Sequence, residues 1–358
     1  MRFVFLNVAF FILGVCFAQK PHDSTRMNGI RILASHNSYK KQPQKKVLKF
    51  LKRFEDKLGA HNNPDYIDYG HLRFSDQFDK YGIRGLELDV NYDPKGGHYK
   101  RRRVNFFLFS QRQRLKGGAL KKPGFKLLHI ADVDFETNYL TLKDALQEVK
   151  AWSKCHPGHI PIYINIEAKG SHPADESKAL QRLGFTTCIP FDTLAYHSLE
   201  QEINEVFEKE EVYRPSDFRQ SYSSLRARID SIGWPLLKDV SGKVIFILEG
   251  SNHQIYKSFS NASLFYFGTE NDSNAIFLLR NNAVGQLDEI RRLSKFFMIR
   301  TRTDAGTIES RQNNYSVWNA AIDTEAQILS TDYYMPDRRW STYKVGFKNG
   351  LYQTIKTP

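Results

Sequence analysis

Several features that would assign this 358-residue chain to a common class are missing from its sequence. No linker or low-complexity stretch interrupts it, which favours one domain over several. Its apolar N-terminal stretch, residues 4–17, is too short to predict a membrane span. No glycine-rich turn of the form G-x-G-x-x-G follows the first predicted strand, which argues against a dinucleotide-binding sheet. No nucleic-acid-binding motif is present either.

Cysteine is scarce, with three in the whole chain. One of them, Cys16, lies in the apolar stretch between Arg2 and Ala18, a pattern typical of a cleaved secretory signal peptide. We therefore expect residues 1–18 to be a signal peptide and residues 19–358 to form a single exported domain. Export would leave Cys155 and Cys188 in an oxidising compartment, which favours a disulfide between them. Two buried free thiols are the alternative.

Basic residues outnumber acidic ones by 52 to 39, for a formal net charge of +13. They cluster in residues 40–53, 100–103 and 112–122. Such clusters suit an anionic lipid surface or a nucleic acid, and a solvated basic face is the other interpretation. The missing motif and the predicted export exclude nucleic acid from our expectations. We expect a monomer that contacts a membrane peripherally through a basic rim.

Apolar runs and helical periodicity alternate from about residue 30 to residue 331. Strands are predicted at 30–34, 83–91, 125–130, 160–167, 243–249, 264–267, 296–302 and 327–331, with a further short one at 104–110. Helices are predicted at 47–58, at 142–152 behind the capping box Thr141-x-x-Asp144, from the capping box Ser198-x-x-Gln201 onward, at 281–293, and around Val317 and Ala321. About eight βα units predict an α/β fold, a (βα)8 TIM barrel, with a doubly wound open sheet as the alternative.

Two carboxylates lie inside the apolar strand 83–91. Glu87 and Asp89 are two residues apart, so both point to the same face of the strand. A pair of acids in an apolar strand is costly unless a positive charge neutralises it. The pair therefore predicts a bound cation.

Polar residues recur at the C-terminal ends of the predicted strands, where TIM barrels carry their chemistry. They are His36, Asn37, Glu87, Asp89, His129, Glu167, Lys169, Arg300, Arg302 and Asp332. Carboxylate and amide oxygens from Asn37, Glu87, Asp89 and Glu167 suit a hard cation, calcium before magnesium. A salt bridge with Lys169 is the alternative role for Glu167.

Two histidines that face a metal can share proton transfer in phosphodiester cleavage. We assign this role to His36 and His129. Lys169, Arg300 and Arg302 are suited to binding phosphate oxygens, and pairing of one or both arginines with helix carboxylates is the alternative.

Four motifs resemble the catalytic motifs of phosphatidylinositol-specific phospholipase C: Ser-His-Asn-Ser-Tyr at 35–39, Gly-Ile-Arg-Gly-Leu-Glu-Leu-Asp at 82–89, Leu-Leu-His at 127–129 and Ile-Asn-Ile-Glu-Ala-Lys at 164–169. The chain is more similar to the secreted, calcium-dependent, single-domain branch. Features of that branch are Gly-Gly-x-Tyr at 96–99, Gly-Trp-Pro at 233–235, Gly-Lys-Val at 242–244 and the ending at 326–333.

This resemblance implies a distorted TIM barrel of the PLC-like phosphodiesterase type. It implies that His36 and His129 are catalytic, and that Asn37, Glu87, Asp89 and Glu167 hold calcium. The implied reaction is attack of the inositol 2-hydroxyl on its own phosphodiester, which gives diacylglycerol and a cyclic inositol phosphate.

Three other functions fit parts of the same pattern. A glycerophosphodiester phosphodiesterase also places Glu-x-Asp, His and Glu-x-Lys on barrel strands, but it tends to have Arg-Gly where this chain has His36 followed by Asn37. A sphingomyelinase D-like enzyme uses a related barrel. An inactive lipid-binding barrel is the non-enzymatic alternative, and the complete set of histidines and oxygen ligands argues against it.

Overall fold

The computed structural model describes residues 24–58, 63–108, 118–250, 253–259, 261–348 and 351–355. The predicted signal peptide and residues 112–117 of the third basic cluster lie outside the described residues. Within the described part of the chain, no helix is both long and apolar enough to cross a membrane.

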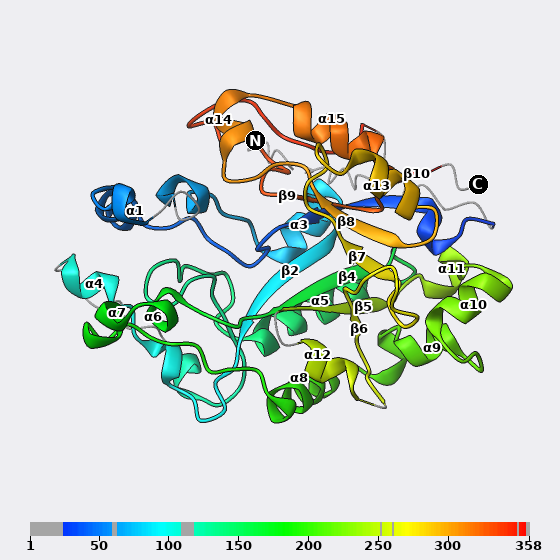
Figure 1. Ribbon diagram of the computed structural model, residues 1–358, viewed down its shortest axis with the longest axis horizontal. Helices are drawn as coiled ribbons and strands as arrows, with labels where there is room; N and C mark the ends of the chain where they lie inside the picture. The colour runs from blue at the N-terminus through cyan, green and yellow to red at the C-terminus, as the bar shows by residue number, and fades with distance from the viewer. Residues whose placement is uncertain are drawn as a thin grey trace, which may run out of the picture.

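Eight parallel strands form a barrel with helices around it (Figure 1). Their order is β6-β5-β4-β2-β1-β9-β8-β7, and a parallel bridge between Phe267 and Phe277 joins the two ends. The predicted (βα)8 barrel is confirmed. The strands are β1 (Ile30–Ser35), β2 (Ile83–Asn91), β4 (Ile162–Ala168), β5 (Val244–Glu249), β6 (Phe265–Tyr266), β7 (Phe277–Leu279), β8 (Met298–Arg302) and β9 (Ile328–Thr331).

Strand β4 shows how the sequence builds the barrel wall. Its residues Ile162, Ile164 and Ile166 are buried in the core that also contains the apolar faces of helices α5 and α8. Because side chains alternate along a strand, the intervening residues Tyr163, Asn165 and Glu167 point to the barrel interior. The same alternation directs the acidic pair of β2 inward. The end of the barrel at the C-termini of the strands is called the mouth below.

Helix α5 (Leu142–Cys155) begins where its capping residue predicts, because the Thr141 side chain accepts a hydrogen bond from the Asp144 backbone. Helix α8 (Thr193–Val206) does not. Its N-cap is Asp192, and Ser198, predicted to open this helix, lies inside it and donates to the Leu194 carbonyl. The other helices are α1 (Lys45–Lys52), α2 (Glu55–Leu58), α3 (Phe74–Tyr81), α4 (Val104–Phe107), α6 (Pro173–Glu176), α7 (Lys178–Arg182), α9 (Pro215–Arg219), α10 (Leu225–Ile232), α11 (Leu237–Val240), α12 (His253–Lys257), α13 (Leu287–Leu293), α14 (Ile308–Gln312) and α15 (Ser316–Asp323).

Several predicted elements are wrong in type or length. Residues 104–107, predicted as a strand, form the short helix α4. The predicted strand 125–130 is reduced to β3 (Lys126–Leu127), which pairs antiparallel with the end of β2 and leaves His129 on a loop. Strand β10 (Tyr352–Thr354), antiparallel to β1, was not predicted. Short apolar runs are ambiguous between helix and strand, and tertiary contacts decide between them.

The predicted disulfide between Cys155 and Cys188 is wrong, since both cysteines are free. Cys155 is exposed at the end of α5, which leads to the N-terminal end of β4. Cys188 is buried, with its Sγ 3.0 Å from the Lys169 carbonyl, just beyond the C-terminal end of β4. A seven-residue strand is about 20 Å long, whereas the Cα atoms of a disulfide lie roughly 4–7 Å apart.

Candidate active site

Three carboxylates meet at the mouth of the barrel. Glu87 and Asp89 point inward from β2, and Asp89 stands in register with Glu167 on the neighbouring strand β4. One oxygen from each of the three lies within 4.8 Å of the others. The structure therefore brings together three of the four predicted metal ligands.

The fourth predicted ligand, Asn37, lies on the turn that follows β1. Its φ of 47° is left-handed, a conformation that asparagine adopts more readily than most residues. The backbone N–H groups of His36 and Ser38 donate to carbonyls of β9 and β2 and so hold this turn at the mouth. The Asn37 amide donates to the Tyr69 hydroxyl at 3.0 Å, but its buried Oδ1 has no hydrogen-bond partner among the described residues. A buried oxygen without a partner is costly, and a metal ligand bond would remove that cost.

Lys169 supplies positive charge to the acidic cluster. Its Nζ lies 3.0 Å from Asp89 Oδ2 and 2.9 Å from Glu167 Oε1, so the alternative ion pair with Glu167 is present. Burial, and then Glu167, raise the pKa of Asp89 well above its usual value. Burial would also raise the pKa of Glu167, but Lys169 outweighs it and lowers that pKa. Lys169, together with Arg300, which pairs with Glu87, supplies two positive charges against three carboxylates, so a further cation is favoured.

The chemistry of the donors tests which cation fits. Asn37, Glu87, Asp89 and Glu167 offer oxygens only, which are the ligands that Ca²⁺ takes in proteins. Asp89 Oδ1 is buried without a hydrogen-bond partner among the described residues, as is Asn37 Oδ1. Two orphaned oxygens and three converging carboxylates fit a calcium ion.

His36 is held by a carboxylate at the end of β9. Its Nδ1 lies 2.7 Å from Asp332 Oδ1, and the other oxygen of Asp332 lies 2.7 Å from Arg302 Nη2. With Nδ1–H donating to Asp332, Nε2 carries the lone pair, and it lies 3.5 Å from Glu87 Oε1. Burial and then Arg302 lower the pKa of His36 to about 3, against the effect of Asp332. Burial would raise the pKa of Asp332, but Arg302 and His36 hold it well below its usual value.

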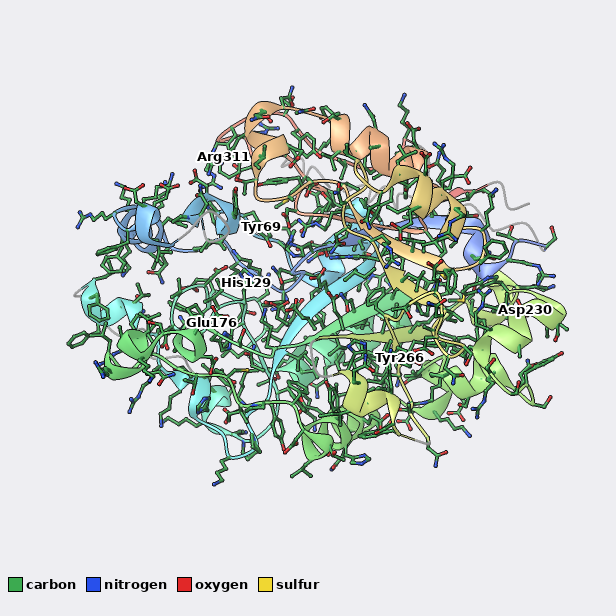
Figure 2. All side chains as sticks on the ribbon, viewed as in Figure 1. Tyr69, His129, Glu176, Asp230, Tyr266 and Arg311 are labelled. Carbon is green, nitrogen blue, oxygen red and sulfur yellow. The ribbon has the colours of Figure 1, made fainter. Side chains whose placement is uncertain are left out.

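His129 is held by a carboxylate of its own loop. Its Nδ1 lies 2.8 Å from Asp134 Oδ2, and that oxygen lies 3.2 Å from the fully buried Nζ of Lys40. Asn91, the last residue of β2, donates to the Leu128 carbonyl at 3.0 Å and fixes the chain just before the histidine. Figure 2 labels His129 and Tyr69 on the side of the barrel that faces α1 and α4.

The two arginines on β8 are both engaged with carboxylates. Arg300, which is buried, pairs with Glu87 Oε2 and donates to Asn281 Oδ1 at 2.7 Å. Burial raises the pKa of Glu87 to about 7, although Arg300 opposes this shift. Arg302 pairs with Asp332, as described above. The alternative of pairing with helix carboxylates is therefore wrong in its partners, since Glu87 lies on β2 and Asp332 directly follows β9.

Several residues of the site were not predicted. Asp332 was noted at a strand end without a role, and its position beside a histidine needs the barrel to be closed. Asp134 follows His129 by five residues, which was the available signal for this pair. Lys40 and Tyr69 come from a polar segment with no pattern that points to the site.

A pocket of 350 Å³ opens beside the acidic cluster. This is within the usual size range of small-molecule sites. One wall carries Glu249, whose Oε2 accepts a 2.6 Å hydrogen bond from Asn165 and whose pKa burial raises. The lining residues are Glu167, Glu249, Gly250, His253, Phe267, Gly268 and Leu279.

Comparisons with solved structures find proteins of similar fold. The chain is similar to the calcium-dependent phosphoinositol-specific phospholipase C from the Gram-negative bacterium Pseudomonas sp, in its myoinositol complex: 16% identity, TM-score 0.53, covering 93% of this chain and 96% of that chain. A second crystal form of that enzyme gives 16% identity and a TM-score of 0.53 over 94% and 98% of the two chains. The Ca²⁺-dependent phosphatidylinositol-specific phospholipase C from Streptomyces antibioticus gives 15% identity and a TM-score of 0.49 over 87% and 96%. The likeness to the Pseudomonas enzyme shows the shared fold.

Sequence comparisons identify the family. No curated protein matches this chain. The family model described as phosphoinositide phospholipase C, Ca²⁺-dependent, matches residues 25–356, which is most of the 358-residue chain. This match confirms the predicted resemblance, the calcium requirement and the phosphodiesterase activity. The chain therefore belongs to the Ca²⁺-dependent phosphoinositide phospholipase C family.

Proposed function

We propose that this enzyme cleaves phosphatidylinositol-type phospholipids at a membrane surface to diacylglycerol and a cyclic inositol phosphate. One observation carries the proposal. Two partly exposed histidines, each with Nδ1 bound to a carboxylate, come from the same barrel mouth as an all-oxygen cation site. We further propose that the enzyme is exported after cleavage behind Ala18 and acts as a monomer.

In this proposal Asn37, Glu87, Asp89 and Glu167 hold Ca²⁺. The bound ion supplies positive charge that stabilises the phosphate in the transition state and acidifies a nearby hydroxyl. Arg300 keeps the Glu87 carboxylate in place through its buried ion pair.

His36 offers the lone pair of Nε2 to a proton, although burial and Arg302 lower its pKa to about 3 and make it a weak base before substrate binds. The inositol 2-hydroxyl loses its proton to Nε2 as its oxygen bonds to phosphorus. Asp332 stabilises the imidazolium that forms, and Arg302 keeps Asp332 ionised. The serine-protease triad uses a carboxylate on Nδ1 in the same way.

His129 is suited to donate a proton to the leaving glycerol oxygen as the second bond to phosphorus breaks. Asp134 supports the protonated imidazole through Nδ1. One bond to phosphorus forms, one breaks, and no water is consumed, so the inositol phosphate leaves as a cyclic diester.

Three cations would contribute to phosphate binding. Lys169 lies at the acidic cluster and is partly exposed, so it can reach a phosphate oxygen. Arg300 and Arg302 are engaged with Glu87 and Asp332, and they add positive potential at the mouth.

The test is a product assay on phosphatidylinositol with the exported protein, whose N-terminus should be Gln19. With Ca²⁺ we expect a water-soluble cyclic inositol phosphate, and chelation should abolish its release. Mg²⁺ should restore little activity. Glu167→Gln should raise the calcium concentration needed for half-maximal activity, because it changes a proposed ligand. Glu270→Gln, a change at an exposed ion pair, should leave that concentration unchanged.

Two results would contradict the proposal. Inactivity on phosphatidylinositol together with hydrolysis of glycerophosphodiesters would move the assignment to that activity. If the cyclic inositol phosphate is released at the full rate in the presence of chelator, the oxygen cluster does not hold a catalytic metal ion.

A further inference from the structure

Tyr69 places a buried hydroxyl between two residues of the candidate active site. Its oxygen accepts a 3.0 Å hydrogen bond from Asn37 Nδ2 and lies 3.0 Å from His36 Nδ1. Asn37 is a proposed calcium ligand, and His36 is the proposed proton acceptor. Because Tyr69 is only 3% exposed, water does not compete for these contacts.

The core does not need this hydroxyl. The ring of Tyr69 belongs to the main apolar core, and it stacks on the His36 imidazole at 6.0 Å between ring centroids. A phenylalanine ring would fill the same space. Taking a hydroxyl out of water is costly unless it is hydrogen-bonded, and the contacts of this hydroxyl are to residues of the site. The hydroxyl therefore serves the site rather than the packing of the core.

The contact with Asn37 fixes the direction of its amide. The amide nitrogen and oxygen share one carbon, so a nitrogen held against Tyr69 directs Oδ1 away from the tyrosine. That oxygen is buried and has no hydrogen-bond partner among the described residues, which fits an oxygen that binds a metal ion. Hydrogen bonds that orient a metal ligand matter for affinity, since their loss typically weakens metal binding or activity by about 10–100-fold.

The contact with His36 is at the nitrogen that Asp332 also binds. Nδ1 lies 2.7 Å from Asp332 Oδ1 and 3.0 Å from the Tyr69 oxygen, so two groups hold the ring on the side away from Nε2. His71 holds the backbone of the same residue, since its Nε2 lies 2.7 Å from the His36 carbonyl oxygen. These contacts direct Nε2 toward Glu87, whose Oε1 lies 3.5 Å away.

Lys40 holds Tyr69 in place. Its fully buried Nζ lies 3.0 Å from the Tyr69 carbonyl oxygen and 4.6 Å from the centroid of the Tyr69 ring. A cation over the face of an aromatic ring is favourable, most of all when water is excluded. The same Nζ lies 3.2 Å from Asp134 Oδ2, the oxygen that binds His129. Tyr69 is therefore fixed through both its backbone and its ring.

We propose that Tyr69 is a positioning residue that couples calcium binding to proton transfer. A single oxygen holds the Asn37 amide, with Oδ1 directed away from the tyrosine, and also holds the His36 imidazole. Through this oxygen, an Asn37 side chain that is held by calcium also restrains the ring of His36. The inference rests on the proposed function for the roles of Asn37 and His36.

Tyr69→Phe tests the coupling, because it removes the hydroxyl and keeps the ring. Calorimetric titration of the whole protein with Ca²⁺, without lipid, should give a dissociation constant about tenfold above that of the wild type, since the Asn37 amide loses the acceptor that orients it. At saturating Ca²⁺, kcat on phosphatidylinositol should also be about tenfold lower with KM unchanged, because His36 loses the same contact.

Tyr256→Phe is the matched control. The Tyr256 hydroxyl is also buried, and it donates to Glu200 Oε1 at 2.5 Å and accepts from the backbone N–H of Leu264 at 2.8 Å. None of these three residues belongs to the candidate active site. Both tyrosine variants should lower the melting temperature in the absence of calcium. Only Tyr69→Phe should change the calcium dissociation constant and kcat, which a merely structural role would leave unchanged.

A double variant shows whether the hydroxyl acts through Asn37. Asn37→Ala alone should weaken calcium binding, and Tyr69→Phe added to it should weaken binding no further. The proposal is overturned if the double variant loses a further tenfold in affinity, or if Tyr69→Phe changes only one of the two quantities or neither. Failure of the proposed function has a different signature, in which Asn37→Ala binds Ca²⁺ as the wild type does. Asn37 would then not be a ligand, and the coupling would fall with it.

Discussion

The two histidines at the mouth make the same contact but are supported by different parts of the molecule. His36 and His129 are equally exposed, at 22% of the side chain, and each places Nδ1 within 2.8 Å of an aspartate oxygen. The partner of His36 comes from the end of a different strand, β9, and is backed by Arg302 on β8. The partner of His129 comes from the same loop, five residues later.

The cations behind the two aspartates also differ. Arg302 stays charged under all ordinary conditions, so Asp332 always faces a positive charge. Lys40 is fully buried, and burial lowers its pKa against the effect of Asp134. A lysine can therefore lose its proton when its partner is removed, whereas an arginine cannot. The aspartate that holds His36 therefore faces the permanent charge of Arg302. The aspartate that holds His129 faces Lys40, whose charge depends on its protonation.

Removing either imidazole is the largest test of this comparison. His36→Ala and His129→Ala should each lower kcat by roughly 10²–10⁴-fold, the usual contribution of a general acid or base. Calcium should still raise the melting temperature of both variants, because neither histidine is a proposed ligand. Loss of the calcium effect in both variants would contradict the assigned roles, and full activity in either would remove that histidine from the mechanism.

Replacing the two aspartates tests the difference between the permanent charge of Arg302 and the protonation-dependent charge of Lys40. Asp332→Asn leaves Arg302 without its main partner, and we expect a loss of about 3–5 kcal/mol in the free energy of unfolding. Asp134→Asn should cost less, about 1–3 kcal/mol, because Lys40 can release its proton and keeps two backbone carbonyl acceptors.

Urea unfolding at neutral pH measures both losses. Asp288→Asn is the control, since that side chain is 96% exposed and should change the free energy by less than about 0.5 kcal/mol. If Asp134→Asn lowers the free energy of unfolding more than Asp332→Asn does, Lys40 does not release its proton when its partner is removed.

The barrel could be predicted from the sequence because its long strands carry strong signals. The range predicted for β2 is the one observed, and β5 and β9 differ from their predictions by one residue. Strand β7 was not predicted because three residues carry too little periodicity. Ser198 gave a false helix start because serine inside a helix can bond to the carbonyl four residues earlier, which sequence alone does not separate from a cap.

The candidate site was predictable where its residues lie on barrel strands. Glu87, Asp89 and Glu167 converge because alternation and strand register place them together. The supporting residues were not predictable, because their positions depend on contacts across the barrel. Asp332 lies 296 residues from His36 in sequence, and Lys40 reaches Asp134 only after two loops fold against each other.

A smaller effect tests whether the support of His36 extends one residue further. Asp304 is buried, and its Oδ1 accepts a 2.8 Å hydrogen bond from the backbone N–H of Asp332. Burial, followed by Asp332, raises the pKa of Asp304 to about 7, against the effect of Arg302. The folded state thus holds a proton that the unfolded chain releases near its usual pKa of about 4.

The sign of the pH dependence follows from this difference. Stability from the protonated Asp304 is complete below about pH 4 and is lost as the pH rises toward 7, by at most about 4 kcal/mol. Asp304→Asn removes this dependence. In urea unfolding, the free energy of unfolding of the variant should therefore rise relative to that of the wild type between about pH 4.5 and about pH 8. Asp288→Asn should show no such trend. A constant difference between Asp304→Asn and wild type would place Asp304 outside the charged network, and the support of His36 would then end at Asp332 and Arg302.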